Sequence, residues 1–185
     1  PWNLPLYLLT WKLAPALAAG NCVVAKPSEV TPRSAHRLSE LVSESGLPPG
    51  VLNFVHGTGS SVSAKLVQHP AVAAISFTGS TATGAHIARA TAGSFKKLSL
   101  EMGGKNPFLV FADADLDFAV KECVRAGFSN QGQICLCGSR VLVEASVYDE
   151  FTKKLVAAVA KLKGGDPLSP DTDQGALVSS KKKKK

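Results

Sequence analysis

Apolar and polar residues follow one another in a repeating order along the first hundred positions of the chain. Short apolar runs predict strands at 22–25, 51–55 and 73–77. Each run leads into turn residues and then into a longer segment that predicts a helix, at 31–45, 61–68 and 81–91. Strand, loop and helix in this order are typical of a parallel sheet with helices on its faces. We therefore expect an α/β fold with a Rossmann-like parallel sheet, whose loops after the strands meet at the end where ligands bind.

Proline and glycine set the borders of the first helices. A segment rich in leucine and alanine, 6–19, predicts a helix that contains Pro15 and stops at Gly20. In the next helix we expect Thr31 to cap the N-terminus and Pro32 to occupy the first turn, where proline is tolerated.

Beyond residue 97 the pattern changes. A short strand at 98–100 is predicted to deliver Glu101 to the edge of a glycine turn. Further strands are predicted at 106–111 and 140–144, and helices at 115–128 and 147–162, the last with Ser146 as its cap. Residues 168–180 show little periodicity. The part from 103 to 180 therefore has the pattern of an unfinished second domain, and we expect the chain to be a central piece of a longer protein.

Composition excludes several classes of protein. Of 185 residues, 45% are hydrophobic and 19% charged, which is ordinary for a globular chain with a real core. The net charge is +7, but five of these charges belong to Lys181–Lys185, and the other basic residues are scattered, so we expect no nucleic-acid partner. The lysine run 181–185 is predicted to be a disordered tail. No apolar run is long enough to cross a membrane and no secretory segment opens the chain, which favours a cytoplasmic protein.

The chain has four cysteines, at 22, 123, 135 and 137. None forms a C-x-x-C pair, so neither a disulfide framework nor a structural zinc site is predicted, and reduced thiols are expected. Cys135 differs from the others because it lies in a loop with glycine on both sides and with the amides of Asn130, Gln131 and Gln133. Such surroundings suit a nucleophilic thiolate. The alternative is that Cys135 and Cys137 are small buried apolar side chains.

Two other loops offer candidate chemistry. Gly79–Gly84 joins a predicted strand to a predicted helix, where backbone N–H groups and the helix dipole suit an anion. The spacing is that of neither the dinucleotide glycine motif nor the phosphate-binding loop, and an ordinary helix cap by Ser80 or Thr81 explains it equally well. Glu101 stands at a strand end before two glycines, where it can face a cavity or simply lie on the surface.

Together, three segments of the chain resemble the aldehyde dehydrogenase superfamily. Residues 128–140 are similar to its active-site cysteine segment, and the resemblance implies that Cys135 is the nucleophile. Leu100–Lys105 resembles the segment that carries the general base, which implies that role for Glu101, and Pro1–Asn3 resembles the segment in which Asn3 donates to the oxyanion. Cys137 has no matching role.

The resemblance also implies a nicotinamide dinucleotide site. Phe-Thr-Gly-Ser at 77–80 and Lys-Pro-Ser-Glu at 26–29 are similar to the family's cofactor segments. Glu29 is then expected to accept from the ribose hydroxyls and to repel a 2′-phosphate, which favours NAD over NADP; its alternative role is a first-turn acid at a helix N-terminus. The residues expected to contact the cofactor are Trp2, Lys26, Ser28, Glu29, Gly59, Phe77, Thr78, Gly79, Ser80, Thr83, Gly84, Met102 and Gly103.

The function implied by the resemblance is oxidation of a small-molecule aldehyde to a carboxylic acid by the hydrolytic route, in a parent enzyme that is a homo-oligomer. Residues 1–102 are then part of an NAD-binding domain, and 103–180 the first part of a catalytic domain. The Ile134–Cys137 run is similar to the branch that oxidises muconic semialdehydes. Two alternatives stay open: a catalytically incomplete fragment with weak nucleotide binding, and a thiol-redox protein that works without NAD. No metal is expected.

Overall fold

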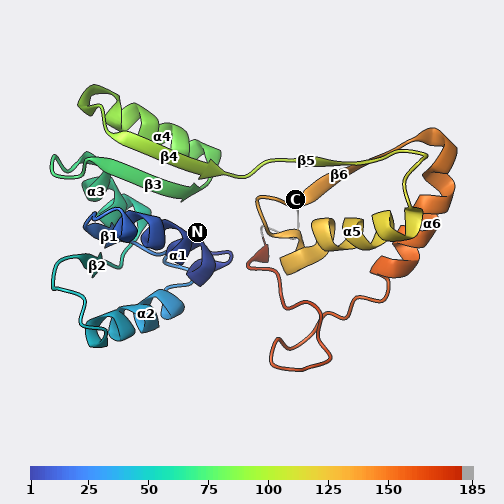
Figure 1. Cartoon of the computed structure of the whole chain (residues 1–185), viewed down its shortest axis with the longest axis horizontal. Helices are drawn as coiled ribbons and strands as arrows, with labels where there is room; N and C mark the ends of the chain where they lie inside the picture. The colour runs from blue at the N-terminus through green and yellow to red at the C-terminus, as the bar shows by residue number, and fades with distance from the viewer. Residues whose placement is uncertain (181–185) are drawn as a thin grey trace. The chain divides into compact units, whose positions relative to one another are not determined.

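The structure is a computed structural model that describes residues 1–180, so the predicted lysine tail lies outside the described residues. The chain forms two compact units, Pro1–Met102 and a second that begins at Gly103 (Figure 1). The helices of the first unit are α1 (Pro5–Ala18), α2 (Arg33–Glu44), α3 (Ala64–Gln68) and α4 (Thr81–Thr91). Its strands are β1 (Val23–Ala25), β2 (Leu52–Phe54), β3 (Ala74–Gly79) and β4 (Lys97–Met102).

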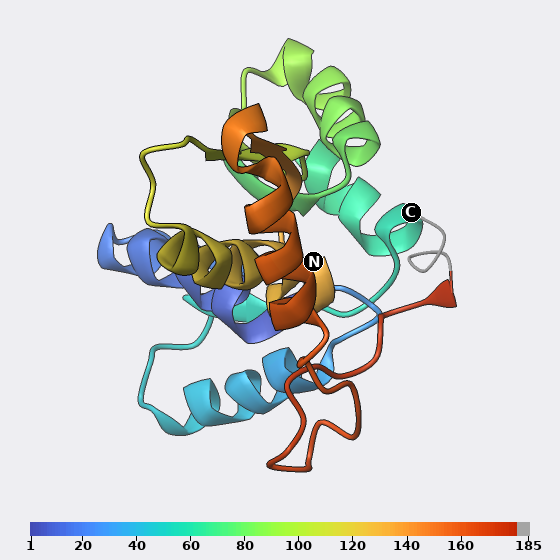
Figure 2. The ribbon, with the colours of Figure 1, turned by 90° about the vertical axis from the view of Figure 1, so that its right-hand side faces the viewer.

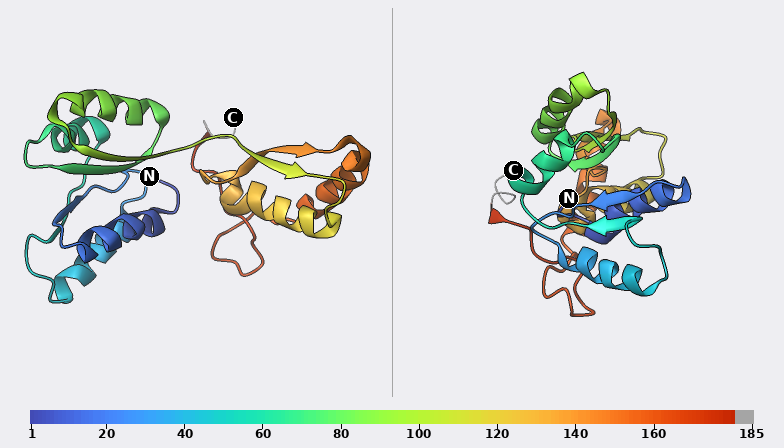
Figure 3. Two further views of the ribbon diagram at one scale, coloured as in Figure 1. Left: turned by 45° about the horizontal axis from the view of Figure 1, so that its top comes forward. Right: turned by 90° about the vertical axis from the view of Figure 1, so that its left-hand side faces the viewer.

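The strands of the first unit form two parallel pairs. β1 pairs with β2, and α2 lies between them in the chain; β3 pairs with β4, and α4 lies between them. Each pair is therefore a strand–helix–strand unit (Figure 3). The α/β class and the parallel pairing are confirmed. The prediction of one continuous sheet is wrong for the described residues, because β1–β2 and β3–β4 are separate sheets. β1 and β2 have three residues each and leave little backbone with which to extend a ladder.

Helix α1 links the two strand pairs. It contacts β1, and the ammonium of Lys12 on α1 donates to the hydroxyl of Ser76 in β3 over 2.8 Å. Pro15 lies inside the helix as predicted, and Gly20, at φ 76°, follows its end. The buried side chains of the first unit come from several helices and one strand: Leu13, Ala25, Ala35, Val67, Ile87 and Thr91.

Two predicted helix starts are wrong in detail. α2 begins at Arg33 without a side-chain cap, because its N-cap position is taken by Pro32, and the Thr31 hydroxyl before it donates to the carbonyl of Trp2 over 3.3 Å. The segment before α3 is a five-residue π-helix, Gly59–Ser63, in which the Thr58 hydroxyl accepts from the N–H of Ser61. The predicted helix 61–68 is therefore a composite of two helix types.

The second unit contains the third parallel pair. Its elements are β5 (Asn106–Val110), α5 (Leu116–Phe128), β6 (Gly138–Val143) and α6 (Tyr148–Val159). β5 pairs with β6 with one irregularity, since Asn106 is opposite Gly138 while Pro107 is opposite Arg140, so Ser139 is an extra residue. α5 contacts β6, and α6 runs across α5 (Figure 2). Val110, Val120, Cys123 and Phe151 form one buried cluster at this junction.

The two helices of the second unit begin differently. The Asp115 carboxylate caps α5, accepting from the N–H groups of Asp117 and Phe118 over 3.0 and 3.1 Å. Ser146 does not cap α6, since its hydroxyl donates to the Glu144 carboxylate and lies in a 3-10 turn, 145–147.

The segment after α6 makes long-range hydrogen bonds despite its irregular sequence. Gly164 and Gln174 form an isolated parallel bridge, and the Lys163 N–H donates to the Asp173 carboxylate over 2.9 Å. From there the segment returns to the loop after α5, where Gln174 Nε2 donates to the carbonyl of Phe128 over 2.8 Å.

Candidate active site

The loops after β1 and β2 meet at Lys26. Its ammonium donates to the carbonyl of Gly57 over 2.8 Å and pairs with the Glu29 carboxylate at 3.2 Å. The Lys26 side chain is mostly buried and that of Glu29 is half exposed. A backbone hydrogen bond and the Lys26 ammonium lower the pKa of Glu29. Glu29 precedes α2 by four residues, so the alternative of a first-turn acid is wrong, and its carboxylate is available to solvent.

Two further predicted residues lie in these loops. Ser28 accepts from the N–H of Val30 over 3.3 Å, which tightens the turn before α2. Gly59 begins the π-helix, and a Cβ added there would meet nothing within 4 Å. The backbone of Gly59 is therefore open to approach by a ligand.

The β3–α4 junction holds six of the predicted residues. Phe77, Thr78 and Gly79 end β3, and Ser80 caps α4 by accepting from the N–H of Thr83 over 3.1 Å. The helix cap predicted as the alternative is therefore present. It leaves the N–H groups of Thr81 and Ala82 without an acceptor among residues 1–180. These groups point their partial positive charge out of the helix.

Close packing explains the glycines of this junction. A Cβ at Gly79 would stand 2.4 Å from the ring of Phe77, and one at Gly84 would stand 2.6 Å from the sulfur of Met102. Gly84 is buried in α4, so Met102 at the end of β4 packs directly on the helix backbone. Gly103, the next residue, has open space around it.

Glu101 lies beside this junction. It is opposite Thr78 in the β3–β4 ladder, so the two side chains share one face of the sheet. The hydroxyl of Thr78 is buried and has no partner among the described residues. Burial lowers the pKa of Lys12, and the charge of Glu101 partly opposes this shift, which places the two groups within electrostatic reach. The structure thus brings Thr78, Glu101 and Lys12 together.

The N-terminal segment lies against the start of α2. The Trp2 carbonyl accepts from Thr31, and both Trp2 and Asn3 are half buried. These contacts place the two predicted residues near the loop that carries Lys26 and Glu29, within the same unit.

The cysteine loop, residues 129–137, comes after α5 in the second unit. Asn130 and Gln131 have left-handed backbones at φ 50° and 56°, and Gly132 is next at φ 72°. A Cβ at Gly132 would stand 3.0 Å from the carbonyl of Gly127, so glycine is required on two grounds. Non-glycine residues in this region are uncommon and mark strain that the surroundings must hold.

Cys135 lies in a tight turn, next to the exposed Leu136. The N–H of Cys137 donates to the carbonyl of Ile134 over 3.2 Å, which makes Cys135 and Leu136 the two central residues of the turn. Cys135 is half buried, whereas Cys137 is 7% exposed and Cys123 1%. Burial raises the pKa of the Cys123 thiol. The expectation that Cys137 is a packing residue agrees with its burial.

The backbone of Cys135 is held on one side only. Asn106 Nδ2, at the start of β5, donates to the carbonyl of Cys135 over 2.7 Å and to that of Cys137 over 3.2 Å. The N–H of Cys135 has no acceptor among residues 1–180. An N–H next to a thiol in an open turn is suited to hold a developing oxyanion.

Sequence reasoning missed Lys12, Asn106 and Gln174. Lys12 lies within an apolar helix, and nothing in its neighbours marks it. The sequence pattern predicts Asn106 only as the first residue of a strand, although the proline after it is a signal that the backbone there cannot donate. Gln174 lies in a segment without periodicity, where the pattern of apolar residues carries no information about partners.

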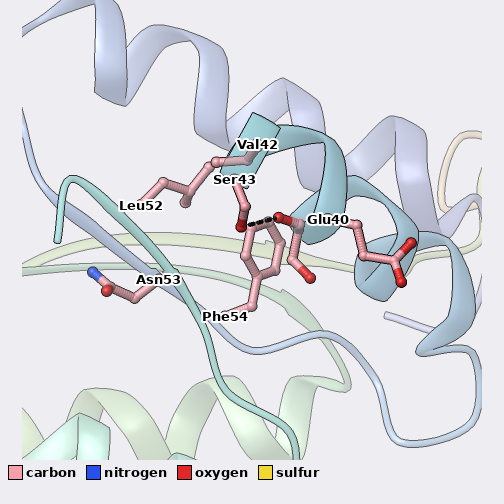
Figure 4. A pocket seen from close by; sticks show the side chains of 7 residues that line it. Glu40, Val42, Ser43, Leu52, Asn53 and Phe54 are labelled. Atoms are coloured by element: carbon pink, nitrogen blue, oxygen red, sulfur yellow. Dashed lines mark hydrogen bonds between the residues drawn. The ribbon is translucent and has the colours of Figure 1, made fainter. Parts of the chain in front are cut away.

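Two hollows of the first unit are lined by residues other than the predicted ones. One lies between α2 and β2, lined by Ser39, Glu40, Val42, Ser43, Leu52, Asn53 and Phe54 (Figure 4). Phe54 lies beneath Ser43 there, and the Glu40 carboxylate points away from it. In residues 1–180 no group of three or more potential ligands for a metal ion occurs, and no helix is long and apolar enough to span a bilayer.

Known proteins resemble this chain both in sequence and in structure. The model of the aldehyde dehydrogenase family matches residues 1–185. The chain is 57% identical over 179 residues to a 2-aminomuconic semialdehyde dehydrogenase of Danio rerio, covering 97% of this chain and 37% of that protein. It is 50% identical to a 2-hydroxymuconic semialdehyde dehydrogenase of Pseudomonas putida, covering 100% of this chain and 38% of that protein.

Solved structures agree. PnpE from Pseudomonas sp. WBC-3 superimposes with a TM-score of 0.95 at 44% identity, over 100% of this chain and 38% of that one. A betaine aldehyde dehydrogenase from Staphylococcus aureus, in complex with NAD+, gives 0.94 at 42% identity, over 98% of this chain and 36% of that one. The chain spans a little over a third of the length of the curated relatives it matches.

Proposed function

Because this chain belongs to the aldehyde dehydrogenase family, we propose that the protein that carries it oxidises an aldehyde to a carboxylic acid with NAD, through Cys135. The observation that carries the proposal is the state of Cys135, which lies in an open turn with its own N–H free among the described residues. Residues 1–102 supply the cofactor site in this proposal, and the unit from Gly103 supplies the nucleophile.

The residues of the first unit are suited to a dinucleotide. The half-exposed Glu29 carboxylate, held by Lys26, is an acceptor for ribose hydroxyls, and its charge disfavours a 2′-phosphate. The free N–H groups at the start of α4 suit a pyrophosphate. The unpartnered hydroxyl of Thr78 offers one more hydrogen-bonding group beside Glu101. NAD bound there supplies a hydride acceptor.

Cys135 carries out the first step. Its thiolate adds to the aldehyde carbon, and the oxygen of the tetrahedral adduct takes up the negative charge. The N–H of Cys135 and the side-chain amide of Asn3 are the proposed donors to that oxygen. When the oxygen reforms its double bond, the carbon loses its hydrogen as hydride, and the acyl group remains on the sulfur as a thioester.

Glu101 completes the cycle. Its carboxylate takes a proton from water, the hydroxide adds to the thioester carbon, and the Cys135 thiolate leaves as the carboxylic acid is released. Glu101 is the last residue but one of β4, opposite the buried hydroxyl of Thr78, and it is exposed, so its carboxylate is open to water. A base at this position favours hydrolysis of the thioester over its transfer to another acceptor.

The substrate class proposed is the semialdehydes of muconic acids. Support comes from relatives that are 57% and 50% identical and are named for 2-aminomuconic and 2-hydroxymuconic semialdehydes. The Ile134–Cys137 run carries the same resemblance in the sequence. The rival proposal is that residues 1–185 alone are catalytically incomplete and bind nucleotide weakly, because the relatives are much longer.

The experiment is to replace Cys135 by alanine and Glu101 by glutamine in the intact protein and to follow NADH. Cys135→Ala should abolish aldehyde-dependent NADH formation while NAD still quenches tryptophan fluorescence. Glu101→Gln should keep a burst of about one NADH per site and lose at least about a hundredfold in steady turnover. The replacement Cys22→Ala, at an exposed cysteine, is the matched control and should change nothing.

Continued turnover by Cys135→Ala would refute the nucleophile, and full turnover by Glu101→Gln would remove the base. NADH formation by residues 1–185 alone, measured beside the intact protein, separates the enzyme from the incomplete fragment. Peroxide reactivity without any dependence on NAD would favour the thiol-redox alternative.

A further inference from the structure

We propose that Asn106 is the positioning residue of the cysteine loop, which its side-chain amide holds in the turn that presents Cys135. The inference rests on the proposed function of Cys135. It goes beyond that function because it assigns a role to a residue outside the predicted site and explains how a strained loop keeps one conformation.

The first step is the geometry of the two hydrogen bonds that Asn106 donates to the cysteine loop, together called the clamp. One nitrogen, Asn106 Nδ2, donates both its hydrogens to the carbonyls of Cys135 and Cys137, over 2.7 and 3.2 Å. An amide NH2 group has two donors, so both are used. The Cys135 carbonyl belongs to the central peptide of the turn and the Cys137 carbonyl to the peptide that follows the turn, so the two bonds fix both peptide planes.

The second step is the position of Asn106 at the irregular end of the β5–β6 ladder. The pairing skips Ser139 between Asn106 and Pro107, and Pro107 has no N–H to donate. The ladder begins at the pair Asn106–Gly138, so Cys135 lies outside it and no ladder N–H is opposite its carbonyl. Here the side chain of Asn106 supplies that donor, in a partly buried place where an unsatisfied carbonyl is costly.

The third step is the strain in the loop itself. Asn130 and Gln131 occupy the left-handed region. The hydrogen bonds within the turns are short-range: the N–H of Gln133 donates to the carbonyl of Asn130, and the N–H of Cys137 donates to that of Ile134. Short-range bonds alone do not choose between turn conformations of similar energy. The clamp from Asn106, 29 and 31 residues away in sequence, ties the turn to β5 and so to the buried cluster around Val110.

The consequence for chemistry is that the Cys135 carbonyl faces Asn106 while its N–H and thiol stay clear of it. Without the clamp, the peptide after Cys135 is free to rotate, and the N–H and sulfur lose their common orientation. Asn106 then acts through the loop and does not touch the reacting atoms.

The test compares Asn106→Ala with Asn53→Ala in the intact protein. Asn53 is a matched control, because its Nδ2 also donates to two backbone carbonyls, those of Gly50 and Val23, over 2.8 and 3.4 Å, from a strand of another parallel pair. Two quantities are measured: deuterium uptake by peptides that cover 129–140, and the rate and amplitude of the first-turnover NADH burst.

For Asn106→Ala we expect faster exchange at the N–H groups of Gln133 and Cys137 and a burst about tenfold slower, with the KM for NAD changed less than about twofold. Asn106→Ser keeps one donor, so its exchange and burst rates should fall between those of the alanine variant and the wild type. The serine variant also tests the proposal if the alanine variant does not fold. Asn53→Ala should leave both readouts unchanged.

Wild-type exchange and burst rate in Asn106→Ala would overturn the proposal, as would an equal loss in Asn53→Ala. Failure of the proposed function looks different. If Cys135→Ala still oxidises aldehyde, the nucleophile is wrong, yet the exchange measurement at 129–140 still decides whether Asn106 holds the loop.

Discussion

The two units place their candidate chemistry at different helix termini, the first at the N-terminus of α4 and the second after the C-terminus of α5. In the first unit, the β3–α4 junction uses the N-terminus of α4, where two N–H groups are free among the described residues. In the second unit, the cysteine loop comes after the C-terminus of α5, where carbonyl groups collect. There side chains supply the donors. Asn106 donates to the carbonyl of Cys135, Ser129 donates to that of Arg125, and Gln174 donates to that of Phe128.

This difference arises from the polarity of the helix. A helix N-terminus offers donors and attracts anions without help from side chains, so short residues and glycine are enough. A helix C-terminus offers acceptors, and a loop built there has to bring amide and hydroxyl donors from elsewhere. The same strand–helix–strand connectivity therefore gives a ready-made ligand loop in one unit and a loop that depends on distant partners in the other.

The packing of the two units also differs, and the largest expected effect on stability tests it. Phe151 is 1% exposed in the single buried cluster of the second unit, whereas the buried residues of the first unit are spread over several elements. We expect Phe151→Ala to destabilise the second unit by about 3–5 kcal/mol. Denaturant unfolding combined with deuterium exchange measures each unit by its own peptides.

The exposed Leu168, replaced by alanine, is the control for this prediction and should cost almost nothing. Equal loss of protection in peptides of residues 1–102 would show that the two units unfold together and that the contrast in packing has no energetic meaning.

A smaller effect compares the two helix caps. Ser80 caps α4 with one hydrogen bond, and Asp115 caps α5 with two. Replacement by alanine should cost about 1 kcal/mol in each case, and more for Asp115, because its negative charge also interacts with the helix dipole. Thermal or denaturant unfolding of the two variants gives the difference. A larger cost for Ser80→Ala would contradict this ranking, and Ser146→Ala, at a position that caps nothing, serves as the reference.

These caps also show how much the sequence could predict. The pattern of apolar residues predicted where strands and helices lie, and the cap that Ser80 makes was one of the two offered for α4. Thr31 and Ser146 have equally good cap chemistry but bond to Trp2 and Glu144, and no local pattern distinguishes these outcomes. Whether a polar residue caps a helix depends on which other groups lie within reach of it.

The residues of the candidate site also fall into those that the sequence suggested and those that only the structure revealed. The resemblance to the family pointed to Lys26, Glu29, Ser80, Glu101 and Cys135, which lie in or beside loops between regular elements. Lys12, which donates to Ser76 in β3, and Asn106, which donates to the cysteine loop, come from elements distant in sequence and carry no local mark. The single continuous sheet was expected for a related reason, since repeated strand–helix order shows parallel pairing but not which pairs join.

The smallest effect expected is a pH dependence of the second unit that arises from Cys123. Burial raises the pKa of the Cys123 thiol above its ordinary value of 9.0. The stability this thiol contributes is therefore full below about pH 9 and is lost as pH rises through the folded-state value, since the unfolded chain ionises first.

Denaturation between pH 8 and 10 should show this fall in the free energy of unfolding of the second unit. The slope should disappear in Cys123→Ala and persist in Cys22→Ala, where the thiol is exposed. An unchanged slope in Cys123→Ala would assign the effect to another group.

The extra residue Ser139 in the β5–β6 ladder determines which deletions the second unit can tolerate. Side chains on a strand alternate between faces, so one surplus residue reverses the alternation between the residues before it and the residues after it. Deleting Ser139 would make the ladder regular, but it would also draw the turn before it one position along β6 and carry the Cys137 carbonyl out of reach of the amide that now holds it. The irregularity acts as a spacer, and the second unit should accept substitutions at Ser139 far more readily than its removal.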